Sequence, residues 1–140
     1  MNRRNLLAFL GIAAAAPAFA QQKKPTAKQR VLFQVSDNDP AKWSLALNNA
    51  KNVQADLGKD NVQIEIVAYG PGLAMLKADS KVGDRLAGAL DDSVGLIACE
   101  NTMQNTKVTR DQMYDGIKYV QAGVTHIMKR QQEGWAYIRP

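Results

Sequence analysis

Hydrophobic and polar residues follow one another along the chain in blocks that predict strands and helices in turn. Residues 31–35 are apolar and rich in β-branched side chains, and the turn residues 36–40 come directly after them. This pattern predicts a buried strand. Asp39 and Pro40 then provide a capping side chain and a first-turn proline, and Gly58 provides a stop, so a helix is predicted between them. Its apolar stripe, with spacings of three and four, consists of Trp43, Leu47, Ala50, Val53 and Leu57.

The same alternation continues to the end of the chain. Four further strands are predicted at residues 62–69, 94–98, 117–121 and 135–139. Between the second and third strands we predict a break at Gly70–Gly72, a helical turn at 73–76, and a helix that is capped by Asp79 or Ser80 and carries Val82, Leu86 and Leu90. Between the third and fourth strands we predict a short helix after Asn101. A further short helix begins with a Thr109–Gln112 capping box and ends near Gly116. The last helix is predicted to end at Gly134. Its inner face is predicted to consist of Val124, Ile127, Met128 and Gln131. Strands that alternate with helices predict a three-layer α/β/α fold around a five-stranded, mainly parallel sheet.

The first twenty residues have the three-part pattern of an export signal. Arg3 and Arg4 give a basic start, an apolar stretch follows, and residues 18–20 form a cleavage site of the A-x-A type. The apolar stretch is shorter than the roughly 20 residues that span a bilayer, so cleavage near Ala20 is expected rather than a retained anchor. The arginine pair resembles a twin-arginine signal, and the Sec route also stays open. The expected location is the periplasm or the exterior, with no membrane contact after cleavage.

The rest of the chain divides into a linker and one domain. Residues 21–29 are polar and show no apolar period, which indicates a flexible linker, and residues 30–140 have the size of a single domain. Loss of Arg3 and Arg4 lowers the formal charge from +5 to +3. The remaining lysines are mostly scattered, so the charge does not indicate nucleic-acid binding.

Cys99 is the only cysteine, and it stands where the apolar run 94–98 ends. A single cysteine cannot form an internal disulfide, so its thiol is free, bonded to another chain, or used chemically. Ligands bind at the carboxyl ends of parallel strands, which is where this residue falls. A helix that starts near Asn101 or Thr102 would direct N–H groups at the sulfur and favour the reactive thiolate, whereas the charge of Glu100 would oppose it. The alternative is inert packing, because free cysteines are often buried.

Other candidate motifs have simpler interpretations. Gly70–Gly72 is neither a dinucleotide-binding nor a Walker motif, and a turn explains it. Residues 37–39 lack the glycine and the distal glutamate of a calcium loop, and helix capping explains them. His126 has no Cys or His partner for zinc and falls off the apolar stripe of the last helix, which predicts a solvated position. No metal, no cofactor and no hydrolytic triad are predicted.

Several motifs together resemble the DsrE/DsrF-like family of small sulfur-relay proteins, in particular its exported single-domain branch. The resemblance covers residues 30–140 and rests on "VLFQVSDNDPAKW", "ALNNAKN", "IEIVAYGPGL", "ACENTM", "VQAGV" and "QQEGWAYIRP". It implies ring-like homo-oligomers, often trimers or hexamers. It also implies that Cys99 occupies the position of the cysteine that accepts sulfur as a persulfide, with Asn101 and Thr102 holding the backbone around it.

Two functions follow as hypotheses. In the first, Cys99 carries sulfur and delivers it to a thiol-containing acceptor protein, an activity that is at most sulfur transfer. The second is a non-catalytic homo-oligomer in which Cys99 is structural. A small ligand would then bind near Gly70, Gly72 and Cys99, in clefts between subunits.

Overall fold

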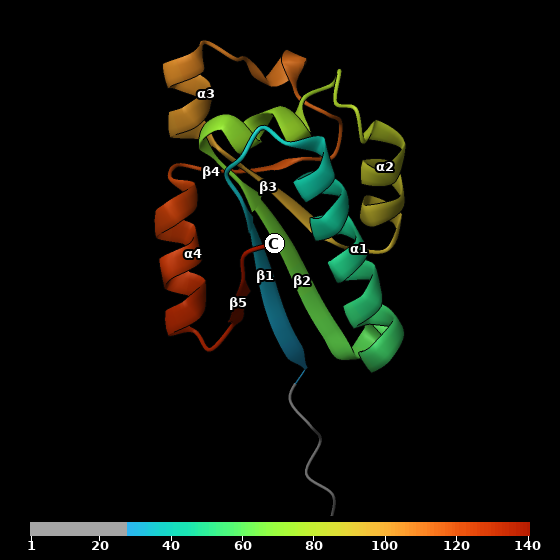
Figure 1. Ribbon diagram of the computed structural model, residues 1–140. Helices are drawn as coiled ribbons and strands as arrows, with labels where there is room; N and C mark the ends of the chain where they lie inside the picture. The colour runs from blue at the N-terminus through green and yellow to red at the C-terminus, as the bar shows by residue number, and fades with distance from the viewer. Residues whose placement is uncertain (1–27) are drawn as a thin grey trace, which may run out of the picture.

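A computed structural model of the chain describes residues 28–140 (Figure 1). Five strands form one sheet in the order β4-β3-β2-β1-β5, and every neighbouring pair is parallel. This confirms the predicted α/β fold and makes the sheet fully parallel. The predicted signal peptide, residues 1–20, and most of the predicted linker lie outside the described residues.

The strands lie within two residues of their predicted bounds. They are β1 (Gln29–Val35), β2 (Val62–Ala68), β3 (Gly95–Cys99), β4 (Lys118–Val120) and β5 (Ala136–Ile138). The shift of β3 makes Cys99 the last residue of that strand rather than the residue after it.

The helices follow the predicted order, with differences at several ends. The α-helices are α1 (Pro40–Leu57), α2 (Gly83–Asp91), α3 (Glu100–Thr106) and α4 (Gly123–Gln132), and the 3₁₀ helices are η1 (Lys59–Asn61), η2 (Gly70–Leu76) and η3 (Arg110–Gln112). Helix α1 is confirmed at both ends, because Asp39 Oδ1 accepts the Ala41 N–H at 2.9 Å and Gly58 takes φ +88°. Within residues 28–140 no helix has both the length and the apolar character needed to cross a membrane.

Helix α2 begins later than predicted, with Val82 rather than Asp79 or Ser80 at its N-cap. The preceding segment pairs elsewhere: Lys77 bridges to Met113, and the Ala78 N–H donates to the Gln112 carbonyl at 2.9 Å. These bonds hold the segment outside the helix.

Two short elements also differ in length from their predictions. Helix η2 already starts at Gly70, so the Gly70–Gly72 break is itself helical. The capping box of Thr109 and Gln112 is confirmed, but η3 ends at Gln112 rather than near Gly116.

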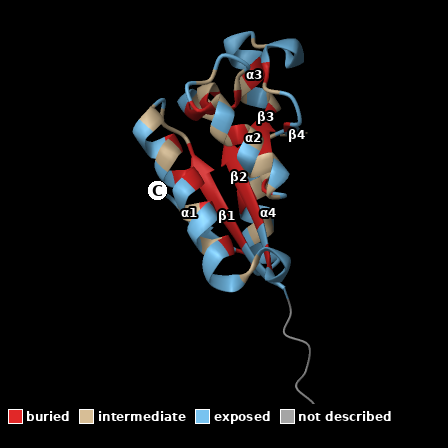
Figure 2. Cartoon of the chain, turned by 90° about the vertical axis from the view of Figure 1, so that its right-hand side faces the viewer, coloured by how far each residue is buried: buried red, intermediate tan, exposed pale blue. Residues whose placement is uncertain are grey.

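Helices cover both faces of the sheet, α1 and α2 on one side and α4 on the other (Figure 1). Figure 2 shows β1 and β2 buried between these layers. The larger core lies under α1 and α2 and contains Phe33, Trp43, Ile66 and Leu86 among its members. The core under α4 is small, and its buried residues are Leu32, Val67, Ile97, Ile127 and Trp135.

The predicted inner face of α4 is wrong. Val124 and Met128 are 60% and 49% exposed, and of the predicted stripe only Ile127 is buried; Gln131 is exposed as well. His126, predicted to be solvated, instead turns inward and contacts Glu65 on β2, with 2.7 Å between His126 Nε2 and Glu65 Oε2. Glu65 is buried in the middle of the sheet. Because an unpaired buried charge costs far more free energy than two exposed apolar side chains, α4 turns His126 inward rather than Val124 and Met128.

Candidate functional site

Cys99 lies at the end of β3, at a point where the chain leaves the neighbouring strands β3 and β4 toward opposite faces of the sheet. Strands β3 and β4 are paired, with Cys99 opposite Val120. After β3 the chain passes over the larger core, into which Met103 and Met113 pack. After β4 it enters α4, whose Ile127 belongs to the smaller core on the other face. Ligands of parallel α/β sheets bind at such switch points, so the topology itself marks Cys99 as the candidate site.

Gly123 lets the first turn of α4 approach Cys99 closely. A Cβ atom added at Gly123 would lie 3.1 Å from Tyr69 Cβ and 3.3 Å from Cys99 Cβ, so a larger residue would displace its neighbours. The backbone amides of Gly123, Thr102 and Asn101 lower the pKa of the Cys99 thiol, although the Asn101 N–H itself donates to the Gln121 carbonyl at 3.0 Å. The starts of two helices, α3 and α4, therefore both favour the charged form of the sulfur.

The Thr102 hydroxyl also stabilises the charged form of the sulfur. Its oxygen accepts the Gly70 N–H at 2.9 Å, and the hydroxyl also bonds to the Cys99 sulfur. A hydroxyl carries one proton. With Gly70 donating to the oxygen, that proton is available to the sulfur. In the thiol form the Cys99 S–H can donate to the Gln121 carbonyl, 3.8 Å from Sγ.

These contacts set the acidity of the Cys99 thiol. Burial raises its pKa, but the hydrogen bonds from the Thr102 hydroxyl and the surrounding amides together outweigh burial, so the pKa lies below its ordinary value. Glu100, which could have opposed this, forms an ion pair with Arg110 at 3.1 Å between Oε1 and Nη2. The site therefore favours a thiolate.

The site residues predicted from the sequence have different roles in the structure. Cys99, Thr102 and Gly70 form one hydrogen-bonded chain. Asn101 bonds mainly to Gln121: its N–H donates to the Gln121 carbonyl at 3.0 Å, and its exposed side chain accepts from Gln121 Nε2 at 2.5 Å. Gly72 does not reach the sulfur: a Cβ there would lie 2.3 Å from the Val35 carbonyl oxygen, so this glycine serves backbone packing.

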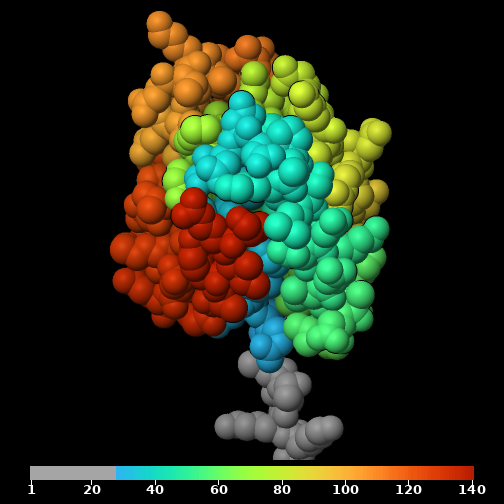
Figure 3. Space-filling view, in the orientation of Figure 1, coloured from blue at the N-terminus to red at the C-terminus, as the bar shows by residue number. Residues whose placement is uncertain are grey.

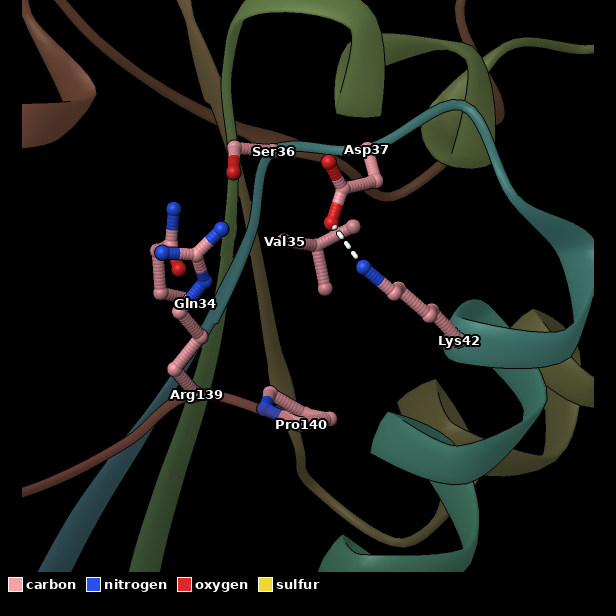
Figure 4. Close-up of a pocket in the computed structure, with 7 residues that line it drawn as sticks. All are labelled: Gln34, Val35, Ser36, Asp37, Lys42, Arg139 and Pro140. Carbon is pink, nitrogen blue, oxygen red and sulfur yellow. Dashed lines mark hydrogen bonds and ion pairs between the residues drawn. The ribbon is translucent and has the colours of Figure 1, made fainter.

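Access to the sulfur is narrow. Cys99 is 5% exposed, and the four best-formed hollows of residues 28–140 are lined by other residues. A small hollow does lie at the end of β1, where the C-terminal segment meets the β1–α1 connection (Figure 3). Asp37 and Lys42 form an ion pair of 2.5 Å across it, with Arg139 alongside Gln34 (Figure 4). Its volume of about 10 Å³ leaves room for one water at most.

The sequence reasoning missed Gly123, Tyr69 and Gln121. A glycine directly after a strand and at the start of a helix, as in the run "VQAG", was the available signal for Gly123. It also missed the buried Glu65, although a charged residue inside the apolar run "IEIV" signals a required partner. Within the described residues, no three His, Cys, Asp or Glu side chains gather as a metal site would require.

Comparison with solved structures identifies a relative by sequence identity and further proteins that share only the fold. The protein of unknown function MTH1491 from Methanobacterium thermoautotrophicum is 38% identical, with a TM-score of 0.76 over 80% of this chain and 99% of that one. The ychN protein from E. coli is 11% identical, with a TM-score of 0.65 over 80% and 99% of the two chains. The protein of unknown function BT1422 from Bacteroides thetaiotaomicron is 15% identical, with a TM-score of 0.62 over 84% and 99%. No protein-family model and no curated protein matches the sequence.

Proposed function

The chain belongs to the same family as MTH1491 and has the DsrE/DsrF-like fold of YchN, and we propose that it is a carrier of sulfane sulfur that uses Cys99 as the acceptor. One observation carries the proposal: Cys99 ends a strand at the switch point of the sheet, where the Thr102 hydroxyl and the amides of two helix starts lower the pKa of its thiol. Such donors stabilise a thiolate, which is the form that attacks sulfur.

The proposed loading step is a sulfur transfer without net oxidation. The Cys99 thiolate attacks the outer sulfur of a persulfide donor, R–S–SH. A bond forms between Cys99 Sγ and that sulfur, the S–S bond of the donor breaks, and R–S⁻ leaves and takes up a proton. Cys99 then holds the persulfide Cys–S–SH, and no metal, electron carrier or nucleotide takes part.

Delivery requires a second thiolate, which attacks the outer sulfur of the persulfide and releases Cys99. A thiol of lowered pKa is a good leaving group, so the same hydrogen bonds that favour loading also favour release. Since the chain has only one cysteine, the acceptor thiol must belong to another molecule. We propose that this acceptor is a thiol-containing protein.

The low exposure of Cys99 favours a second candidate, a non-catalytic oligomeric binding protein in which the cysteine only packs. The two candidates differ in one measurable property. A sulfur carrier needs a thiol that reacts in the folded protein, whereas a packing cysteine reacts only after unfolding.

The native alkylation rate of Cys99 between pH 5 and pH 10 tests the carrier proposal. We expect the folded protein to react with a midpoint below about 8.5, the value of an unperturbed thiol, because the hydrogen bonds lower the pKa. The Thr102→Val variant loses the hydroxyl bond and should show a higher midpoint. Thr125→Val, on the exposed side of α4, is the matched control and should behave like the parent. Intact mass reads the reaction without ambiguity, since only one thiol can be labelled.

Two results would contradict the carrier proposal. The first is a protein that is alkylated only in denaturant. The second is a folded Thr102→Val variant with the midpoint of the parent, which would mean that the hydroxyl does not act on the sulfur.

We also propose that the protein is a homo-oligomer, a trimer or a hexamer. Val124 and Met128 lie one turn apart on α4 and leave adjacent apolar surface exposed, which supports this proposal. Light scattering coupled to size exclusion should give a mass of three or six subunits, and the replacement of both residues by glutamine should lower it. A monomeric mass at high protein concentration would refute the proposal.

A further inference from the structure

A polar cluster under α4 takes no part in the chemistry proposed for Cys99. Arg130 holds the buried carboxylate of Glu65 through two bonds, Nη2 to Oε1 at 2.7 Å and Nε to Oε2 at 3.2 Å. His126 Nε2 lies 2.7 Å from Glu65 Oε2. At the outer end, Arg130 Nη1 donates to Glu133 at 2.9 Å, and Arg30 of β1 donates to the Glu133 carbonyl at 2.7 Å.

The cluster determines which side of α4 faces the sheet. Gly123, His126, Ile127 and Arg130 recur at spacings of three and four and share the inner face. The apolar stripe of Val124, Ile127 and Met128 lies one residue position further around the helix, a rotation of about 100°. By hydrophobicity alone that stripe would face inward, yet two of its three residues are exposed.

The rotation of α4 in turn determines what touches Cys99. Gly123 lies on the same face as His126 and Arg130 and packs against Cys99, and its amide lowers the pKa of the Cys99 thiol. If the apolar stripe turned inward, Gly123 would move sideways, and Val124 would approach the place where a single added carbon is already only 3.3 Å from Cys99 Cβ.

We propose that Glu65, His126 and Arg130 are positioning residues, which select the rotation of α4 that holds Gly123 against Cys99. None of the three touches the sulfur; they act through the helix. The proposal rests on the proposed sulfur-carrier function for its biological meaning, but its physical content concerns only the state of the Cys99 thiol.

The pH profile of Cys99 alkylation in the purified protein tests the proposal. In Glu65→Gln the charge that holds Arg130 and His126 is lost, and we expect the midpoint to rise and the reaction at pH 7 to slow several-fold. Lys129→Ala, on the exposed side of the same helix, is the control and should leave the profile unchanged. A purely structural role of Glu65 would lower stability in urea without moving the midpoint.

A milder variant covers the case in which Glu65→Gln does not fold, since it leaves Arg130 buried without its partner. His126→Gln keeps the Glu65–Arg130 pair and should shift the midpoint in the same direction, by less. A folded Glu65→Gln or His126→Gln protein with the parental midpoint would overturn the proposal. Persulfide loading of the parent is measured separately: if the parent does not load but the midpoint still moves, the carrier function fails and the positioning role stands.

Discussion

Replacement of Cys99 by serine is expected to abolish sulfur loading. After incubation with a small persulfide donor and removal of the excess, the parent protein should gain the mass of one sulfur atom, and Cys99→Ser should gain none. The reason is chemical: a serine hydroxyl is not ionised at neutral pH and cannot form a persulfide, and the chain has no other thiol. Non-reducing intact-mass measurement distinguishes a persulfide from a mixed disulfide with the donor.

The serine variant should remain folded, which makes this result interpretable. Its hydroxyl fits the space of the thiol and can donate to the Gln121 carbonyl, which the Cys99 sulfur already faces. Circular dichroism and the urea midpoint should stay near those of the parent. If a folded Cys99→Ser protein still gained the mass of a sulfur atom, this result would contradict the carrier proposal.

Gly72→Ala is expected to be the most damaging glycine-to-alanine substitution within residues 28–140. Its Cβ would lie 2.3 Å from the carbonyl oxygen and 2.6 Å from the carbonyl carbon of Val35. These are main-chain atoms at the end of the buried strand β1, so no side chain can move aside. We expect a loss of more than about 3 kcal/mol in the free energy of unfolding, a large share of the roughly 5–15 kcal/mol typical of a domain. Urea denaturation measures this loss.

Gly88→Ala is the matched control for that substitution. Gly88 lies on the exposed side of α2, and a Cβ there meets nothing within 4 Å. Alanine stabilises a helix interior by roughly 0.5–1 kcal/mol relative to glycine, so this variant should be as stable as the parent or more so. Equal losses in both variants would mean that the close approach of Gly72 to β1 is not what the position requires.

The sequence was sufficient for the elements whose signals are local. Asp39, Pro40 and Gly58 mark the ends of α1 through their own backbone and capping preferences, and the structure places α1 between them. The apolar runs predicted all five strands. Strands β1, β2 and β3 are largely buried, and a strand buried on both faces leaves a continuous hydrophobic signature, whereas the edge strands β4 and β5 are more exposed.

Around the candidate site the sequence was informative mainly about the central residue. Cys99 could be placed at a strand end from its position after an apolar run. The closeness of Gly123 and Tyr69 to it could not, because both belong to other elements, and only the pairing of β3 with β4 brings the start of α4 beside the sulfur. The role of Gly72 was out of reach for the same reason, since its approach to Val35 depends on how β1 and η2 lie in space.

The rotation of α4 marks the boundary between what the sequence determined and what the tertiary structure decided. Hydrophobic periodicity is a property of the helix alone, and it predicts that Val124 and Met128 face inward. The partner that overrides it, Glu65, is 61 residues from His126 in the chain and reaches it only because β2 is a central strand of the sheet. The sequence by itself determined the alternating α/β order and the position of the one thiol. The environment of that thiol depended on a buried charge that must be paired, a requirement expressed only once the sheet and the helix have come together.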